Sequence, residues 1–220
     1  TNIRSMNFSA QMGLETVGTL AAFSFSRMTP RGSDRIERVD EQEEEVVLKQ
    51  IKEFYKDYTL FYSDAIFKNK DYYVIKENGR VVAGVQIYPV RWNIVDFGGK
   101  LANGAVRLLT RIPWIRKRIS PDELSFLAYD AIYCEPGYEK VLYELMEGVL
   151  ERTGKYIALL MMDLESDLYG IFSEQKKLGI LHLITGTTHA DIRVRVIHMP
   201  DAARQEFYKR PTYIPTYDNS

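Results

Sequence analysis

The fold is decided by residues 124–162, which read LSFLAYDAIYCEPGYEKVLYELMEGVLERTGKYIALLMM. Leu124 to Tyr133 is apolar enough for an interior strand, and Glu135-Pro136-Gly137 then turns the chain. Apolar residues return at helical spacing from Val141 to Leu150, and a glycine follows as a helix stop. Ile157 to Met162 is a continuous apolar run, typical of a strand buried on both faces. This order predicts two parallel strands joined by a right-handed crossover.

Upstream of this unit, the sequence predicts a helix and a hairpin. Acidic residues from Glu41 to Glu45 favour a helix start, because the helix dipole stabilises negative charge there. Apolar residues from Val47 to Tyr58 follow at helical spacing. Two β-rich runs, Tyr72 to Lys76 and Arg80 to Tyr88, flank Asn78-Gly79, a strong two-residue hairpin signal.

Downstream, we expect a helix from Ser166 to Leu178, ended by a glycine, and two strands over 181–185 and 192–197. His198-Met199-Pro200 stops the last strand, and the tail that follows is expected to be loosely ordered. At the other end of the chain, a short helix ending at Gly13 precedes a predicted strand pair within residues 16–28.

Composition narrows the class of protein. Of 220 residues, 45% are hydrophobic and 27% charged, as in ordinary folded chains, and a net charge of -1 provides no field to attract nucleic acid or an anionic membrane. The single cysteine, Cys134, excludes an internal disulfide, and His182, His189 and His198 lack metal-ligand spacing. We therefore expect a cytoplasmic protein that uses no metal and has no nucleic-acid or membrane partner.

One stretch departs from this even charge. Residues 100–118 contain six basic residues and no acidic residue, interleaved with leucine, isoleucine and tryptophan. Such a stretch is typical of a solvated helix face followed by a basic loop, but it could also contact a phosphate-bearing cofactor or an acidic partner.

The two ends of the chain share a partial repeat. Each has a short helix, a glycine junction at Met12-Gly13-Leu14 or Leu178-Gly179-Ile180, two predicted strands, and a stop at Met28-Thr29-Pro30 or Met199-Pro200. Residues 1–30 match only the last third of the longer unit. This pattern would arise if the chain began inside one domain and then ran through a second.

With these motifs, the sequence resembles the GNAT superfamily of acyl-CoA N-acyltransferases. Asn2-Ile3-Arg4-Ser5, Phe8, Gly13-Leu14 and Val17-Gly18 are similar to the closing helix and strand of that family, and residues 41–199 follow its whole order of elements. The resemblance implies an α/β fold with a GNAT-like central mixed β-sheet flanked by helices. It also implies a division into the end of a preceding GNAT-like domain, a linker, a GNAT-like domain and a C-terminal tail, at residues 1–30, 31–40, 41–199 and 200–220.

The resemblance further implies a site for acetyl-CoA or another acyl-CoA. The family binds the CoA pyrophosphate on backbone N–H groups at a helix N-terminus, in the loop after the central strand. By position, this loop is 135–142. Family members place an Arg or Gln and two glycines there, whereas here only one glycine offers an open backbone. The predicted cofactor-binding residues are Cys134, Gly137, Tyr138, Glu139, Lys140 and Val141.

The family reaction needs a base for the amine and often a tyrosine on the last helix to protonate the leaving thiolate. The matching positions hold Ser9 and Gln175, neither of which can act as that acid. Tyr169, on the same predicted helix, is the candidate acid, although a packed helix residue is the ordinary interpretation. Asp130 and Glu135, near the end of the central strand, are the candidate bases, and both could instead be paired or solvated carboxylates.

Two functions from different classes remain open. The first is an N-acyltransferase that transfers an acetyl or other acyl group to an amine, carried by a small molecule or a protein. The second is a catalytically degenerate GNAT-like domain with a structural or ligand-binding role in a tandem protein. The expected protein partner is an N-terminal GNAT domain or a second copy in a homodimer.

Overall fold

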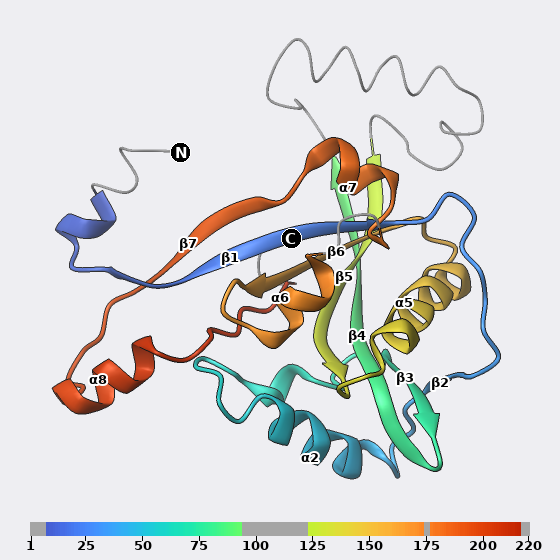
Figure 1. The fold of residues 1–220 in the computed structure, drawn as a ribbon, viewed down its shortest axis with the longest axis horizontal. Coiled ribbons are helices and arrows are strands. Elements are labelled where there is room, and N and C mark those ends of the chain that lie inside the picture. The colour runs from blue at the N-terminus through green and yellow to red at the C-terminus, as the bar shows by residue number, and fades with distance from the viewer. Residues whose placement is uncertain (1–7, 94–122, 174–176, 217–220) are drawn as a thin grey trace.

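The structure, a computed structural model, describes residues 8–93, 123–173 and 177–216. One mixed sheet runs through it in the order β2-β3-β4-β5-β6-β1-β7 (Figure 1). Strands β5 and β6 are parallel, and the other neighbouring strands are antiparallel. The strands are β1 (Glu15–Ser26), β2 (Ile36–Arg38), β3 (Tyr72–Glu77), β4 (Arg80–Asn93), β5 (Glu123–Cys134), β6 (Ile157–Asp163) and β7 (Thr188–Val194).

Helices flank this sheet, as expected for the α/β class. Helix α5 crosses β2, β3, β4 and β5, α2 contacts β5, α6 contacts β6, and α7 and α8 contact β1. Figure 1 shows α5 lying over the β3–β4 side of the sheet, and α2 at the lower edge of the molecule. Their bounds are α2 (Glu44–Phe54), the 3₁₀ helix η1 (Ser63–Ala65), α5 (Glu139–Thr153), α6 (Asp167–Phe172), α7 (Ile180–Thr185) and α8 (Asp201–Tyr208).

The predicted strand-helix-strand unit is confirmed. Strands β5 and β6 pair in parallel, with Leu127 opposite Ala158 and Tyr129 opposite Leu160. Between them, α5 buries its apolar stripe, and Gly154 ends the helix in the left-handed conformation at φ 65°. The Tyr129 hydroxyl donates a 2.6 Å hydrogen bond to the Met146 carbonyl, which fastens the helix to the strand beneath it.

The predicted hairpin is also confirmed. Asn78 and Gly79 link β3 to β4 with φ values of 51° and 77°, as a type I′ turn requires. Glycine and asparagine tolerate this left-handed backbone better than other residues do, so the local sequence determines the turn.

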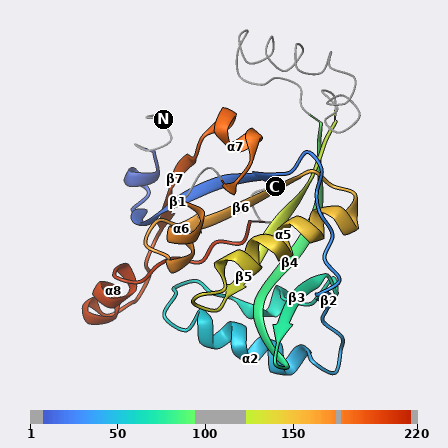
Figure 2. The ribbon, with the colours of Figure 1, turned by 45° about the vertical axis from the view of Figure 1, so that its right-hand side comes forward.

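Strand β1 lies inside the sheet, between β6 and β7 (Figure 2). The expected strand pair within residues 16–28 is wrong in number: the structure has one long strand there, because Phe23-Ser24-Phe25-Ser26 continues without a turn residue. The expectation that this segment is an ordered strand is confirmed. Strands β1 and β2 lie in the predicted end segment and linker, and both belong to the same sheet as the rest of the chain.

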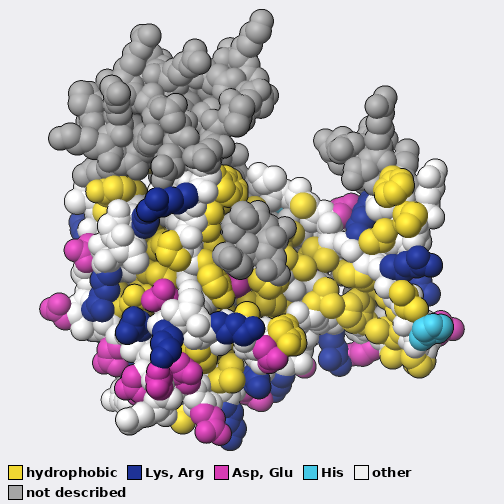
Figure 3. Space-filling model, turned by 180° about the vertical axis from the view of Figure 1, so that it is seen from behind, with side chains coloured by type: hydrophobic (Ala, Val, Ile, Leu, Met, Phe, Trp, Pro, Cys, Tyr) yellow, Lys and Arg dark blue, Asp and Glu magenta, His cyan; other side chains and the backbone are white. Residues whose placement is uncertain are grey.

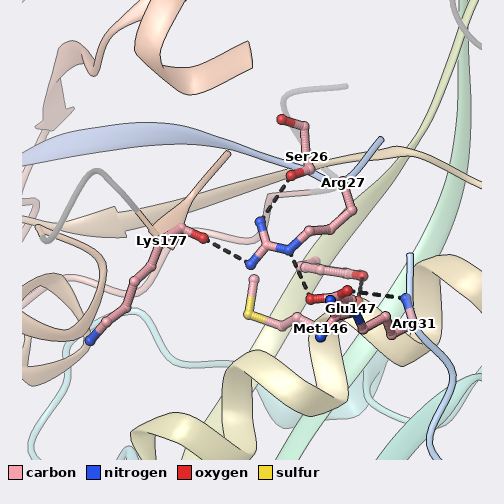
Figure 4. A network of polar contacts seen from close by, with 7 residues as sticks. Ser26, Arg27, Arg31, Met146, Glu147 and Lys177 are labelled. Atoms are coloured by element: carbon pink, nitrogen blue, oxygen red, sulfur yellow. Dashed lines mark hydrogen bonds and ion pairs between the residues drawn. The ribbon is translucent and has the colours of Figure 1, made fainter. Parts of the chain in front are cut away.

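Arg27 ties the end of β1 to α5 (Figure 4). Its Nε donates to Glu147 Oε2 at 2.9 Å, and one of its terminal nitrogens donates to the carbonyl of Lys177 at 2.9 Å. The other oxygen of Glu147 accepts the backbone N–H of Arg31 at 3.0 Å. One arginine therefore joins three segments that are far apart in the sequence.

The downstream predictions need four corrections. Residues 181–185 form helix α7 instead of a strand: the fully buried His182 is followed by two exposed side chains, Leu183 and Ile184, which breaks the alternation of a strand. The helix expected from Ser166 ends at Phe172, and the last strand covers Thr188–Val194 instead of 192–197. The described part of the tail, residues 200–216, is ordered: it forms α8 and then a segment with buried residues. The basic stretch 100–118 lies outside the described residues.

Candidate functional site

Strands β5 and β6 diverge at their carboxyl ends. They pair only from Leu127–Ala158 to Tyr129–Leu160, although β5 continues to Cys134 and β6 to Asp163. Each keeps its antiparallel partner beyond that point, β4 for β5 and β1 for β6. An opening therefore separates two strands of a continuous sheet.

A β-bulge shapes the β5 side of this opening. Gly84 pairs with Tyr133 and Gln86 with Asp130, so two residues of β5 stand opposite one residue of β4. Ala131, in the bulge, has a φ of 42°, a left-handed conformation that is costly for a residue with a side chain. A hydroxyl from Tyr72 holds it there by donating to the Ala131 carbonyl at 2.9 Å.

The residues after α8 occupy the opening. We call residues 211–216 the C-terminal strap. Backbone hydrogen bonds join Thr59 N–H to the Pro211 carbonyl and Tyr213 N–H to the Thr59 carbonyl, each at 2.9 Å. On the β6 side, Thr212 N–H donates to Asp163 Oδ2 at 3.1 Å. The strap thus bridges the two sides of the opening.

Asp130, a predicted base, lies in this opening and is buried. Its Oδ1 accepts the Tyr213 hydroxyl at 2.6 Å and the Ala131 N–H at 2.9 Å. The Tyr213 hydroxyl in turn accepts a weaker bond from the Ala131 N–H at 3.3 Å. Burial, followed by the nearby Asp130 carboxylate, raises the pKa of Tyr213 well above its ordinary value, so Tyr213 stays a protonated donor.

The other two candidate catalytic residues lie elsewhere. Glu135 follows the end of β5 and pairs with Arg80 at 2.6 Å. Tyr169 sits on α6, half-buried, with its ring centroid 5.9 Å from that of Phe23. Neither residue lines the cavity beside Asp130, so the structure does not bring the three candidates together.

The predicted phosphate loop joins β5 to the N-terminus of α5. Gly137 has a φ of 89°, and a side chain there would meet no atom within 4 Å, so its backbone is open to approach. Its N–H, however, donates to Glu139 Oε1 at 2.9 Å. Hydrogen bonds from the backbone of Gly137 and of Glu139 itself lower the pKa of that carboxyl. A carboxylate of the chain therefore occupies the place predicted for an anionic ligand.

The remaining predicted cofactor-binding residues surround this loop. Cys134 is buried, and burial raises the pKa of its thiol to about 12, so it is neither exposed nor a thiolate at neutral pH. Tyr138 lies near Glu77, whose charge and hydrogen bond raise the pKa of its phenol. Lys140 points to solvent, and Val141 packs partly against the core.

Sequence reasoning missed the strap and two of the residues that hold it, Thr59 and Asp163. A signal was present, because Thr212-Tyr213-Ile214 is a β-prone run between two prolines. Its partners are far away in the sequence, so the run alone could not indicate where it binds.

The described part of the chain offers neither a metal site nor a membrane-spanning helix. No group of three or more His, Cys, Asp or Glu side chains among residues 8–93, 123–173 and 177–216 is placed to hold a metal ion. No helix within these ranges has the length and apolarity needed to cross a membrane.

Large apolar side chains are exposed at several places, among them α2, the end of β4, and the segments near β1 and β7. Figure 3, viewed from behind, shows hydrophobic side chains on the half that contains β1, β7 and α8. The homodimer and the N-terminal GNAT domain remain predicted partners. Exposed apolar residues outside the sheet's core include Phe8, Met12, Ile180, Leu183, Ile184, Ile197 and Met199.

No family model and no curated protein matches the chain. Among solved structures, it is similar to N-myristoyltransferase from Saccharomyces cerevisiae with bound myristoyl-CoA, at 8% identity and a TM-score of 0.47 over 75% of this chain and 48% of that one. It is also similar to an acetyltransferase assigned to the GNAT family from Novosphingobium aromaticivorans, at 8% identity and a TM-score of 0.45 over 84% and 69%. It is similar as well to a GCN5-related N-acetyltransferase from Sphaerobacter thermophilus, at 13% identity and a TM-score of 0.44 over 89% of this chain and 58% of that one.

The chain spans about half the length of the N-myristoyltransferase structure. Likenesses this distant carry no argument about the activity or the substrate of this chain.

Proposed function

We propose that the chain is an N-acyltransferase that moves an acetyl or other acyl group from acyl-CoA to an amine. The observation on which this rests is the divergence of the parallel strands β5 and β6 next to the bulged residue Ala131. The Ala131 N–H donates to Asp130 Oδ1 in this structure. If that carboxylate turns toward the amine, a thioester placed between the strands would find the N–H as a donor for its carbonyl oxygen, the kind of fixed dipole that stabilises a developing oxyanion.

In this reaction, the amine nitrogen attacks the thioester carbonyl carbon, a C–N bond forms, and the C–S bond breaks. The amine loses a proton and the CoA thiolate gains one, so the transfer needs no oxidant or reductant. We assign Asp130 as the group that accepts the amine proton, because it lies beside the Ala131 N–H. Glu135 and Tyr169 stay as sequence predictions.

We place the CoA pyrophosphate at the N-terminus of α5, where the open backbone of Gly137 supports the assignment. Glu139 has to move aside for this, because its carboxylate accepts the Gly137 N–H. The acceptor is a small-molecule or protein amine, and the expected cytoplasmic location rests on the sequence alone.

The hydrogen bond from the Gly137 N–H to the Glu139 carboxylate favours a second candidate function. If Glu139 holds the loop permanently, the chain is a catalytically degenerate GNAT-like domain with a structural or ligand-binding role in a tandem protein. The two candidates differ in whether the loop binds CoA.

Titration calorimetry of acetyl-CoA into the full chain separates them. We expect the wild-type chain to bind, E139Q to bind several-fold more tightly because a competing negative charge is removed, and G137V to bind at least about tenfold more weakly because a β-branched residue is strained at this φ. E151Q is the matched control, since Glu151 lies at the opposite end of the same helix.

Release of free CoA in the presence of a panel of amines then tests the transfer itself. No binding to the wild-type chain or to E139Q would decide for the degenerate domain. Binding that G137V leaves unchanged would remove this loop from the site.

A further inference from the structure

We propose that the C-terminal strap is autoinhibitory: residues 211–216 close the opening between β5 and β6 and have to leave before an acyl thioester can enter. This inference rests on the proposed function, because it concerns the same site. It adds regulation of access to that site, which the proposed function alone does not include.

The first step is that the strap fills the opening. The cavity that remains beside it has a volume of only about 20 Å³, lined by Asp130, Ala131, Met162, Tyr213 and their neighbours. That is room for about one water molecule. An acyl chain and its thioester cannot share this space with the strap.

The second step is that the strap engages the very groups assigned to the chemistry. The Tyr213 hydroxyl donates to Asp130 at 2.6 Å and accepts the N–H of Ala131 at 3.3 Å. With Tyr213 in place, the proposed base already accepts a hydrogen bond from the strap. The Ala131 N–H donates chiefly to Asp130 Oδ1 at 2.9 Å, and Tyr213 adds a weaker second acceptor. The ring is held by edge contacts with Tyr55 and Phe61, at centroid distances of 5.1 and 5.0 Å.

The third step is that the strap can leave without unfolding the sheet. Strand β5 pairs with β4, and β6 pairs with β1, through ladders to which the strap contributes no residue. Helix α8, which precedes the strap, has no buried residue. The strap is joined to the body by hydrogen bonds to Thr59, Asp163, Asp130 and the N–H groups of Met161 and Ala131, and by the ring of Tyr213, which packs into the core. Its release therefore breaks these contacts but no strand pairing of the sheet.

A reversible lock tests the inference in the full chain. The hydroxyls of Thr59 and Thr212 lie 3.3 Å apart, so the double variant T59C/T212C places two thiols across the same contact. The native Cys134 is buried and stays out of the exchange. Oxidation then ties the strap in place, and reduction frees it in the same protein.

We expect the reduced variant to bind acetyl-CoA at least about tenfold more tightly than the oxidised variant in titration calorimetry. The wild-type chain, treated with the same oxidant and reductant, should bind equally in both conditions. Equal, measurable affinity of the variant in its two states would overturn the strap and leave the proposed function intact. If neither the wild-type chain nor the variant in either state binds acetyl-CoA, the proposed function is overturned, and the proposal that the strap competes with acyl-CoA is overturned with it.

Two further measurements do not depend on the lock. Hydrogen exchange should show that the Thr212 and Tyr213 amides open more readily than the amides of β1 and β6; exchange only together with these strands would overturn the strap even if CoA binds. Y213F removes only the hydroxyl that covers Asp130 and Ala131, and should bind acetyl-CoA a few-fold more tightly than the wild-type chain. Unchanged or weaker binding would contradict the inference.

Discussion

At the scale of single residues, His182 is placed where a charge is unfavourable. Its side chain is fully buried in α7, and its Nδ1 finds no hydrogen-bond partner among the described residues. Its ring lies 5.5 Å from the ring of Phe23, and its Nε2 is 3.4 Å from the Thr187 hydroxyl. Burial lowers the pKa of this histidine below its ordinary value of 6.5.

This placement predicts a pH dependence of stability. The unfolded chain takes up a proton on His182 near pH 6.5, whereas the folded chain takes it up only at lower pH. The contribution of the neutral histidine to the free energy of unfolding is therefore fully present above pH 6.5 and decreases as the pH falls below it. H182L should lose this part of the pH slope in urea unfolding between pH 7.5 and 5. H189Q, at an exposed position of β7, should keep it, and an unchanged slope in H182L would contradict the assignment.

At the scale of elements, Arg27 is the link between β1 and α5. Its side chain and that of Glu147 are only 22% and 21% exposed, so their ion pair is shielded from water on most sides. The comparable pair of Arg35 with Glu144 has an arginine that is 43% exposed. A partly buried, charge-assisted contact contributes more than an exposed one, which is typically worth 0 to about 1 kcal/mol.

We therefore expect R27A to lower the free energy of unfolding by about 1 to 3 kcal/mol, and R35A by less than about 1 kcal/mol. Chemical denaturation of both variants checks this order. The double variant R27A/E147A isolates the coupling between the two side chains. A coupling near zero would show that Arg27 acts through its carbonyl contacts and its position over the Phe25 ring instead.

Elements with strong local signals could be predicted from the sequence. The periodicity before Gly154 and the Asn78-Gly79 turn each depend on neighbouring residues, so they appear as expected. Helix α7 could not be predicted, because five apolar or aromatic-ring residues in a row between two glycines suit a short strand as well as a helix. Burial of His182 against β1 decides between them, and that contact is not local.

The candidate site shows the same limit. Asp130 could be chosen because it is a carboxylate near the end of a strand that the sequence indicates clearly. The Glu139 carboxylate on the Gly137 N–H and the Tyr213 hydroxyl on Asp130 could not, because each depends on the exact position of a side chain. Tyr213 is also 83 positions away from its partner, which places the strap beyond any local pattern.

At the scale of the whole molecule, β1 decides whether the chain behaves as one cooperative unit. It lies between β6 and β7 and so joins the end of the sheet to its centre. Phe25 is fully buried, with ring centroids 6.4 Å from Tyr129 on β5 and 6.2 Å from Tyr143 on α5. The core of the strand-helix-strand unit therefore includes a side chain from the first strand.

We expect the amides of β1 to exchange hydrogen as slowly as those of β6, because opening either strand breaks the same antiparallel ladder. F25A should lower the free energy of unfolding by about 3 to 5 kcal/mol, a large part of the total for a chain of this kind, and should speed exchange in β5 and β6 as well as in β1. Exchange that quickens in β1 alone would mean that this strand is an appendage of a sheet that is stable without it. The division into an N-terminal segment and a separate GNAT-like domain would then gain support, whereas loss of protection across all three strands would count against it.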